Sequence, residues 1–353
     1  MAIPTTQESQ KTEMKLYSEA VSHPSFLYLT AKNEGLLTDS IDESDYLLLP
    51  FPYEYIFDYQ MHELESRKIS LQDVCLLKEI ALRFDNASVA LGKPLVVTYY
   101  RDPATHLHLG NALVFRTSAF RSAVGTNEFG LPAFLEELTA DPGFHPALKP
   151  IKPSVSFRGQ MAPLSLPFGI ALRQVLNKFF SFFSNKFRVA NWYNEGYLLR
   201  RMAVSSVLKA GNAITADLAI NPEKNASAYN EDYIRSFREN DYFICASGHG
   251  NYSFRLYEVM RAGRIPVFID TDCLLPCDDV IDWKSLFIWI NKNEANNAGS
   301  RIIEFHQTIS PEDFLVRQQL IRKTWENYLS AEGFAKYLFY SFLPKYVAKN
   351  EVS

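Results

Sequence analysis

Apolar residues gather in short runs of strand length along the first part of the chain. These runs lie near 45–51, 93–100, 111–118 and 153–159. Between the first two runs, residues 62–84 have mainly apolar side chains that recur every three or four positions, which is the spacing of one face of a helix. The face expected from this spacing holds Leu71, Val74, Cys75, Lys78 and Leu82. Strands that alternate with helices are typical of parallel sheets covered by helices on both sides.

The same alternation begins again after residue 159. The expected elements are a helix near 168–184, a strand at 212–220, a helix at 227–240 and strands at 241–247 and 264–270. We therefore predict an α/β protein with two such units in tandem and a cleft between them.

Proline and capping residues mark the expected boundaries. The segment 144–155 contains three prolines, and proline disfavours helix at the residue before it. Near the end of the chain, Ser310 followed by Pro311 and Asp313 is a helix start signal. A nearly apolar stripe follows it, formed by Phe314, Gln318, Ile321, Trp325 and Tyr328. We expect domains at 1–150 and 151–310, and terminal helices at 311–353 that pack against a large surface.

Composition narrows the class of protein. The chain has 353 residues, 47% of them hydrophobic, and its longest apolar runs fall short of the ~20 residues of a membrane span. The first fifteen residues lack the apolar core of a signal peptide, so we expect a cytoplasmic protein. Four cysteines do not make a disulfide framework. Cys273 and Cys277 resemble half of a metal site, but no second Cys/His pair follows, and we predict no metal.

Charge is unevenly distributed along the chain. The net charge of −4 argues against general binding to nucleic acid. Residues 39–65 carry eight acidic residues and no Lys or Arg, whereas 173–209 carry seven Lys or Arg and only Glu195 as an acid. Two interpretations stay open, namely solvated faces or a basic wall beside an anionic ligand.

The stretch 246–270 is expected to contain a strand end, a loop, a helix and a strand. In open parallel sheets, ligands bind where strands end and the loop into the next helix is exposed. Gly248 and Gly250 in this loop would let backbone N–H groups approach a ligand, and Asn251 or Ser253 would cap the helix. The positive end of that helix favours phosphate.

Two charged residues lie in the first turns of the expected helix. Arg255 can make a bidentate contact to phosphate, and Glu258, one turn further on the same face, can accept the two hydroxyls of a ribose. The alternative is an i, i+3 surface ion pair between Arg255 and Glu258, beside glycines that only form the turn.

A longer pattern bears on this choice. Residues 255–283 resemble the exostosin family of glycosyltransferases, in which a serine and an arginine precede an aromatic and acidic pair, a small residue with glycine, the letters IPV, a proline and a tryptophan. The matching positions are Ser253, Arg255, Tyr257, Glu258, Ala262, Gly263, Ile265, Pro266, Val267, Pro276 and Trp283. The resemblance is strongest over 241–285, extends back to about 150, and is thin before that.

This resemblance implies a fold and a reaction. The family fold is GT-B, with two Rossmann-like domains, a nucleotide-sugar held mainly by the second, and a final helix that crosses back to the first. The loop would hold the diphosphate of a UDP-sugar, with Arg255 on phosphate and Glu258 on ribose. The sugar would pass with inversion and without a metal ion or other cofactor. The acceptor half of the family varies, so the resemblance implies no acceptor. For a cytoplasmic protein built around a donor site, we expect the acceptor to be a glycan or a lipid-linked saccharide. Eukaryotic members carry a membrane anchor and many disulfides, so a bacterial-type soluble member is the better comparison.

The remaining site residues are less constrained by the pattern. Inversion needs a base on the first domain, and Asp102 follows an apolar strand there, with His106 and Asp58 as further candidates. Asp102 also precedes a proline, as a residue that opens a turn does. His249 would bond the donor or point to water, and Arg158 with Gly159 would face the phosphates or serve the structure.

Two alternatives concern partners. The basic aromatic segment 178–193 could rest on the inner face of a membrane or fill a core. A non-catalytic protein that binds nucleotide-sugar or glycan as a partner subunit is the alternative to an enzyme.

Overall fold

The computed structural model describes residues 14–57, 69–102, 107–134, 144–164, 195–221 and 226–350. The chain divides into two compact units. Unit 1 comprises Met1–Phe134, Leu274–Cys277 and Glu326–Ser353, and unit 2 comprises Leu135–Cys273 and Asp278–Trp325. Each unit is built around one parallel sheet.

The sheet of unit 1 has the strand order β2-β1-β3-β4-β5-β6, and every pairing is parallel. Its strands are β1 (Leu16–Tyr17), β2 (Leu37–Thr38), β3 (Tyr46–Leu48), β4 (Leu95–Tyr99), β5 (Ala112–Arg116) and β6 (Glu128–Gly130). Strands β3, β4 and β5 are buried at every residue, as expected for strands covered on both faces. They confirm the strands predicted from the first three apolar runs.

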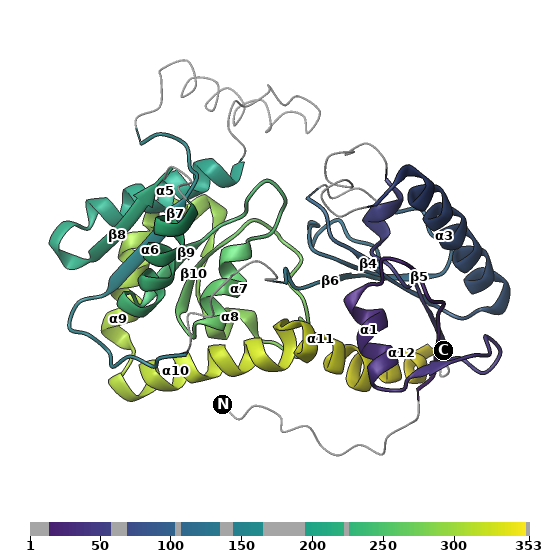
Figure 1. The fold of residues 1–353 in the computed structure, drawn as a ribbon. Coiled ribbons are helices and arrows are strands. Elements are labelled where there is room, and N and C mark those ends of the chain that lie inside the picture. Colours follow the sequence, from purple (N-terminus) through teal and green to yellow (C-terminus); the bar gives the residue numbers. More distant parts are fainter. Residues whose placement is uncertain are drawn as a thin grey trace. The chain divides into compact units, whose positions relative to one another are not determined.

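The sheet of unit 2 has the order β11-β10-β9-β7-β8, again all parallel (Figure 1). Its strands are β7 (Ser154–Gly159), β8 (Thr215–Ile220), β9 (Tyr242–Cys245), β10 (Ile265–Asp270) and β11 (Ile288–Asn291). In both units the first strand has the second on one side and the third on the other. This is a doubly wound order, so both units are Rossmann-like and the predicted GT-B fold class is confirmed at the level of its two domains.

Helices lie between the strands of each unit and follow the last strand, β11. In unit 1 these are α1 (Phe26–Asn33), α3 (Leu71–Leu91), α11 (Ala331–Tyr337) and α12 (Leu343–Asn350). In unit 2 they are α5 (Glu195–Lys209), α6 (Ala226–Glu239), α7 (Phe254–Arg261), α8 (Trp283–Leu286), α9 (Ala298–Thr308) and α10 (Pro311–Thr324). Short 3-10 turns occur at Tyr53–Ile56, Gly211–Ala213 and Lys292–Asn297, and π-helical turns at Trp325–Leu329 and Leu338–Phe342.

The terminal helices follow the sequence signals closely. Helix α10 begins with Pro311, and the side chain of Ser310 accepts the N–H of Asp313 at 3.0 Å. Phe314 and Ile321 on its stripe are fully buried. The chain after Trp325 belongs to unit 1, where the Tyr46 hydroxyl donates to the carbonyl of Leu343 at 2.6 Å. The predicted return of the C-terminal segment to the first domain is therefore observed.

The segment before β7 packs within unit 2. The N–H of Ala147 donates to Gln318 at 3.0 Å, and the Gln318 amide donates back to the carbonyl of Ala147 at 2.8 Å. Buried Arg264 donates to the carbonyl of His145 and to Gln318. These bonds tie residues 144–150 to α10, and the division between the units by contacts falls between Phe134 and Leu135.

Candidate functional site

The carboxyl ends of β7 and β9 meet at the point where the strand order of unit 2 reverses. Strand β7 pairs with β8 on one side and β9 on the other, so the loops that leave β7 and β9 diverge there. Ligands of doubly wound sheets bind at such a switch point. The loop 246–253, singled out from the sequence, follows β9 and lies there.

This loop is held by its own polar contacts. The N–H of Gly248 donates to the carbonyl of Tyr252 at 3.0 Å. Asn251 does not cap α7, because its Oδ1 accepts the Thr271 hydroxyl at 2.6 Å and its amide donates to the carbonyl of Thr271. Ser253 stands at the N-cap position of α7, but its side chain makes no capping hydrogen bond. Asn251 thus links the loops that follow β9 and β10.

His249 is turned toward helix α5. Its Nε2 lies 3.0 Å from the hydroxyl of Tyr197, and the two rings meet edge to face with centroids 5.6 Å apart. Gly196, beside Tyr197, explains the close approach of this helix, because an added Cβ would lie 2.2 Å from the carbonyl oxygen of Ser247. Helix α5 therefore packs directly on the loop.

Arg255 and Glu258 form the i, i+3 pair that the spacing suggested, but the pair is not on the surface. The Nε of Arg255 lies 3.9 Å from Oε2 of Glu258, and the side chains are only 17% and 14% exposed. The Arg255 guanidinium also lies 5.1 Å from the ring centroid of Tyr233 on α6 and 5.7 Å from that of Phe157 on β7. A buried cation of this kind, at the end of a sheet and in the first turn of a helix, is suited to an anion.

Helix α6 contributes a direct contact to this pair. The Tyr233 hydroxyl donates to Oε2 of Glu258. Burial raises the pKa of Glu258, while the charge of Arg255 and the Tyr233 hydrogen bond oppose the rise. Burial also raises the pKa of Tyr233 well above its usual value, so its hydroxyl keeps its proton and remains a donor.

A second guanidinium stands at the same end of the sheet. Arg200 on α5 donates to the carbonyl of Gln160 at 3.0 Å and to that of Ala246 at 3.2 Å, and so joins the loops after β7 and β9. Burial, and then the charge of Arg255, lower the pKa of Arg200 to about 10. Arg200 forms no ion pair with any residue that the structure describes.

Glycines lie against both guanidinium groups. An added Cβ at Gly159 would lie 3.7 Å from an Arg255 nitrogen, and one at Gly248 would lie 3.6 Å from an Arg200 nitrogen. Gly159 also has a φ of 153°, which residues with a side chain rarely adopt. Two guanidinium groups and two glycines without side chains therefore lie together at the switch point.

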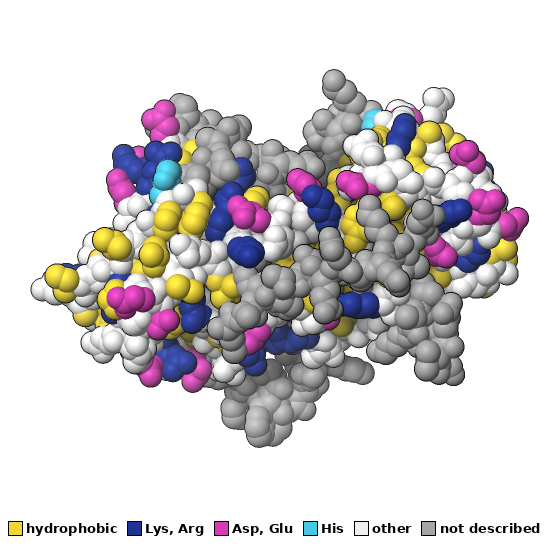
Figure 2. Space-filling view, turned by 90° about the horizontal axis from the view of Figure 1, so that it is seen from below, with side chains coloured by type: hydrophobic (Ala, Val, Ile, Leu, Met, Phe, Trp, Pro, Cys, Tyr) yellow, Lys and Arg dark blue, Asp and Glu magenta, His cyan; other side chains and the backbone are white. Residues whose placement is uncertain are grey.

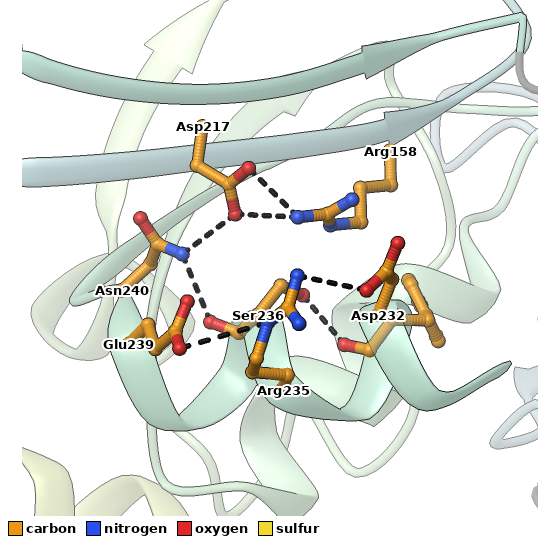
Figure 3. A network of polar contacts seen from close by, with 8 residues as sticks. Arg158, Asp217, Asp232, Arg235, Ser236, Glu239 and Asn240 are labelled. Atoms are coloured by element: carbon orange, nitrogen blue, oxygen red, sulfur yellow. Dashed lines mark hydrogen bonds and ion pairs between the residues drawn. The ribbon is translucent and has the colours of Figure 1, made fainter. Parts of the chain in front are cut away.

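Arg158 takes a different direction from Arg255. Its NH2 donates to both oxygens of Asp217 at 2.7 and 2.8 Å, and the Asn240 amide donates to the same carboxylate at 2.9 Å (Figure 3). The network joins β7, β8 and the end of α6. These contacts favour the structural interpretation of Arg158 over a contact to phosphate.

The candidate base lies in unit 1. Asp102 follows β4 and is exposed, and its carbonyl accepts the Ser118 hydroxyl at 2.6 Å. Buried Glu54, which sequence reasoning passed over, accepts the N–H of Tyr100 at 3.0 Å at the same end of this sheet. His106, Asp58 and the aromatic segment 178–193 lie outside the described residues.

Two further features of the described ranges concern metal ions and membranes. Within them, no group of three or more His, Cys, Asp or Glu side chains is placed to hold a metal ion. No described helix is long and apolar enough to cross a membrane. On the face in Figure 2, acidic and basic side chains are interspersed over the described surface.

Comparison with known proteins bears on this site. Residues 171–304 match the family model described as the Exostosin GT47 domain, and this range contains Arg200, loop 246–253, Arg255 and Glu258. This part of the chain is therefore similar to the exostosin glycosyltransferases, as its motif indicated.

Particular relatives are distant. A probable glycosyltransferase of Arabidopsis thaliana is 33% identical over 63 residues, 18% of this chain and 13% of that protein. Exostosin-1 of Drosophila melanogaster is 26% identical over 109 residues, 31% of this chain and 14% of that protein. The match thus spans a small part of these relatives.

Two solved structures are similar at a TM-score of 0.35 each. TarM is 12% identical, with 70% of this chain and 55% of that chain covered. The sucrose-phosphate synthase of Thermosynechococcus elongatus is 11% identical, with 77% and 79% covered.

Sequence reasoning named Arg255 and Glu258 but not Tyr233, Tyr197 or Arg200. Arg200 was included only in the basic stretch 173–209. Tyr233 stands four residues before Phe237, a spacing that indicates two side chains packed in the core. The two rings do pack together, with centroids 5.0 Å apart. Nothing local distinguishes a core tyrosine from one that also reaches a site.

Proposed function

We propose that this protein transfers a sugar from a UDP-sugar to a saccharide acceptor, with the nucleotide bound at the carboxyl ends of β7 and β9. The observation that carries the proposal is the convergence of Arg200, Arg255 and the start of α7 at the switch point. Guanidinium groups and a helix N-terminus are the groups that proteins use for phosphate.

The same groups suit the chemistry. The acceptor oxygen attacks the anomeric carbon, the bond from that carbon to the β-phosphate oxygen breaks, and negative charge grows on the departing UDP. Arg200 and Arg255 would stabilise that charge without a metal ion. The acceptor hydroxyl loses its proton to a carboxylate, for which we propose Asp102, exposed at the end of β4 in the other unit.

We propose that the acceptor is a glycan or a lipid-linked saccharide, as expected of a transferase built around a nucleotide-sugar site. Turnover of the UDP-sugar should then rise above its slow hydrolysis when such an acceptor is added. Turnover absent with every acceptor, despite tight UDP binding, would indicate the non-catalytic binding protein instead.

Calorimetry with UDP tests the phosphate site. Arg255→Ala and Arg200→Ala should each weaken UDP binding roughly tenfold to a hundredfold, because a charged hydrogen bond to phosphate contributes about 1.5 to 3 kcal/mol. Uridine, which has no phosphate, should bind alike in all variants. Asp102→Asn should keep UDP affinity and lose turnover.

The matched control is Arg235→Ala on α6, since Arg235 is exposed and pairs with Asp232 and Glu239 rather than facing the switch point. Its UDP affinity should equal that of the unaltered chain. Unchanged UDP affinity in both Arg255→Ala and Arg200→Ala would remove the diphosphate from this site.

A further inference from the structure

Tyr233 occupies a place in the candidate site that its sequence context does not explain. It lies on α6, is 6% exposed, and its hydroxyl donates to Oε2 of Glu258 on α7. Its ring faces the Arg255 guanidinium at 5.1 Å and packs edge to face on Phe237. One side chain thus contacts both charged residues that the sequence assigned to the nucleotide.

The two oxygens of Glu258 are in different surroundings. Oε2 accepts the Tyr233 hydroxyl and is the atom nearest to Arg255. Within the described ranges, the hydrogen bond and the ion pair of Glu258 both fall on Oε2 rather than Oε1, and the side chain is 14% exposed. A carboxylate held in this way has one oxygen committed to the protein and one available to a ligand.

We propose that Tyr233 is a positioning residue, which holds Oε2 of Glu258 so that Oε1 is presented to the ribose hydroxyls of the bound nucleotide. The inference rests on the proposed nucleotide site and adds the residue that orients its ribose contact. A ribose diol donates two hydrogen bonds, and a charged acceptor in a fixed orientation binds them more tightly than a mobile one.

The charges around Glu258 allow a separate readout. The groups that face it are Arg255 on its own helix, Tyr233 on α6 and the Cys245 thiol on β9. The charge of Arg255 also acts on Arg200 of α5. Burial raises the pKa of Tyr233 and of Cys245, so both stay protonated near neutral pH. Loss of the Tyr233 hydroxyl should therefore raise the pKa of Glu258 further, because the bond it donates favours the carboxylate.

The experiment compares UDP with 2′-deoxy-UDP by calorimetry between pH 5 and pH 8, on the full chain. The unaltered chain should prefer UDP at neutral pH and lose that preference as Glu258 takes up a proton in acid. In Tyr233→Phe, the preference at neutral pH should be about three- to tenfold smaller, the value of one hydrogen bond, and its pH midpoint should move upward. In Glu258→Gln, the preference should be weak at every pH.

The double variant Tyr233→Phe, Glu258→Gln distinguishes a positioning role of Tyr233 from a packing role. Tyr233→Phe keeps the ring and its contacts, so its effect on the preference should vanish when combined with Glu258→Gln. Tyr242→Phe is the matched control, because it removes another buried hydroxyl of unit 2, one that contacts His306. It should lower the thermal midpoint and leave the preference unchanged.

Each outcome decides the inference. If the unaltered chain prefers UDP and Tyr233→Phe changes neither the preference nor its midpoint, Tyr233 does not position Glu258, and the proposed function stands. If UDP and 2′-deoxy-UDP bind equally, Glu258 does not contact the ribose and the inference fails, although the phosphate site stands. If no UDP binds, the proposed function fails and the inference with it. Should Tyr233→Phe not fold, Glu258→Asp, which is too short to keep the Tyr233 bond, replaces it with the same expected result.

Discussion

At the scale of single residues, the end of the unit 2 sheet holds two guanidinium groups and one carboxylate. The carboxylate of Glu258 forms an ion pair with Arg255. Arg200 has no carboxylate partner among the described residues. A buried charge costs several kcal/mol in desolvation unless another charge or hydrogen bonds compensate it. A diphosphate would supply that compensation, so we expect nucleotide to stabilise unit 2 by about 2.7 kcal/mol at a hundred times its dissociation constant.

A buried histidine of the same unit predicts a pH dependence of stability. His306 on α9 is 3% exposed, its Nε2–H donates to the carbonyl of Pro150 at 2.9 Å, and its Nδ1 accepts from Tyr242 at 2.8 Å. Burial lowers the pKa of His306. The neutral form is therefore favoured in the folded state, and its contribution is complete above the unfolded pKa of about 6.5.

The free energy of unfolding should accordingly fall as the pH drops below about 6.5, by at most about 1.4 kcal/mol per pH unit for this one proton. Urea unfolding between pH 5 and pH 8 measures it. His306→Gln keeps a donor and cannot titrate, so its curve should be flatter, whereas the exposed His108→Gln should follow the unaltered chain. Parallel curves for all three would contradict this assignment.

At the scale of elements, tertiary contacts chose the faces of the helices. Helix α3 exists where a helix was predicted, and Val74 is buried, but Leu71, Cys75 and Leu82 of the predicted stripe are exposed. The buried stripe also includes Leu77 and Phe84. The helix carries apolar residues on more than one face, so spacing alone could not show which face meets the sheet.

Helix α5 and the loop after β9 are in backbone contact, and this contact can be tested. In Gly196→Ala, the new Cβ would lie 2.2 Å from the carbonyl oxygen of Ser247, so the loop or the helix must move. We expect a loss of about 1 to 3 kcal/mol in stability, despite the better helix propensity of alanine, together with weaker UDP binding.

Gly299→Ala is the matched control, since its Cβ would lie 2.5 Å from the carbonyl oxygen of Ser206, at the contact of α9 with α5. Thermal melting should show destabilisation in both variants, and calorimetry should show weakened UDP binding only in Gly196→Ala. Equal UDP affinities would mean that the geometry of loop 246–253 does not matter for the nucleotide.

At the scale of the whole molecule, the first five strands of each unit lie in the same order. Each unit has a switch point between its first and third strands, and in unit 2 this point carries the cationic groups. Asp102 and Glu54 lie at the carboxyl end of the other sheet. In the proposed function, unit 2 binds the donor and unit 1 supplies the base.

This division of roles leads us to expect that turnover of a UDP-sugar persists in EDTA. The charge of the leaving diphosphate would be met by Arg200, Arg255 and the start of α7, which chelation leaves intact. The measurement is the release of UDP with and without chelator, and the control adds manganese or magnesium after chelation. Activity lost in EDTA and restored by either ion would show that a metal takes part.

Much of the fold and part of the candidate site could be predicted from the sequence. Strands β3, β4 and β5 coincide with apolar runs in the sequence. Ser310, Pro311 and Asp313 indicate the start of α10. Loop 246–253 and the spacing of Arg255 to Glu258 are local as well, because three residues in a helix bring side chains to one face. Such features depend on neighbours within a few positions, which the sequence determines by itself.

Only the tertiary structure decided which distant side chains contact loop 246–253, Arg255 and Glu258. Tyr233 reaches Glu258 from α6, and Arg200 reaches the loop from α5, because crossover connections place β7 between β8 and β9. The same folding turned Arg158 to Asp217 and buried an ion pair that the spacing alone could equally place on the surface. Burial and long-range contact set the pKa of Glu258 and of Arg200, and both arise from strand order, which no local pattern encodes.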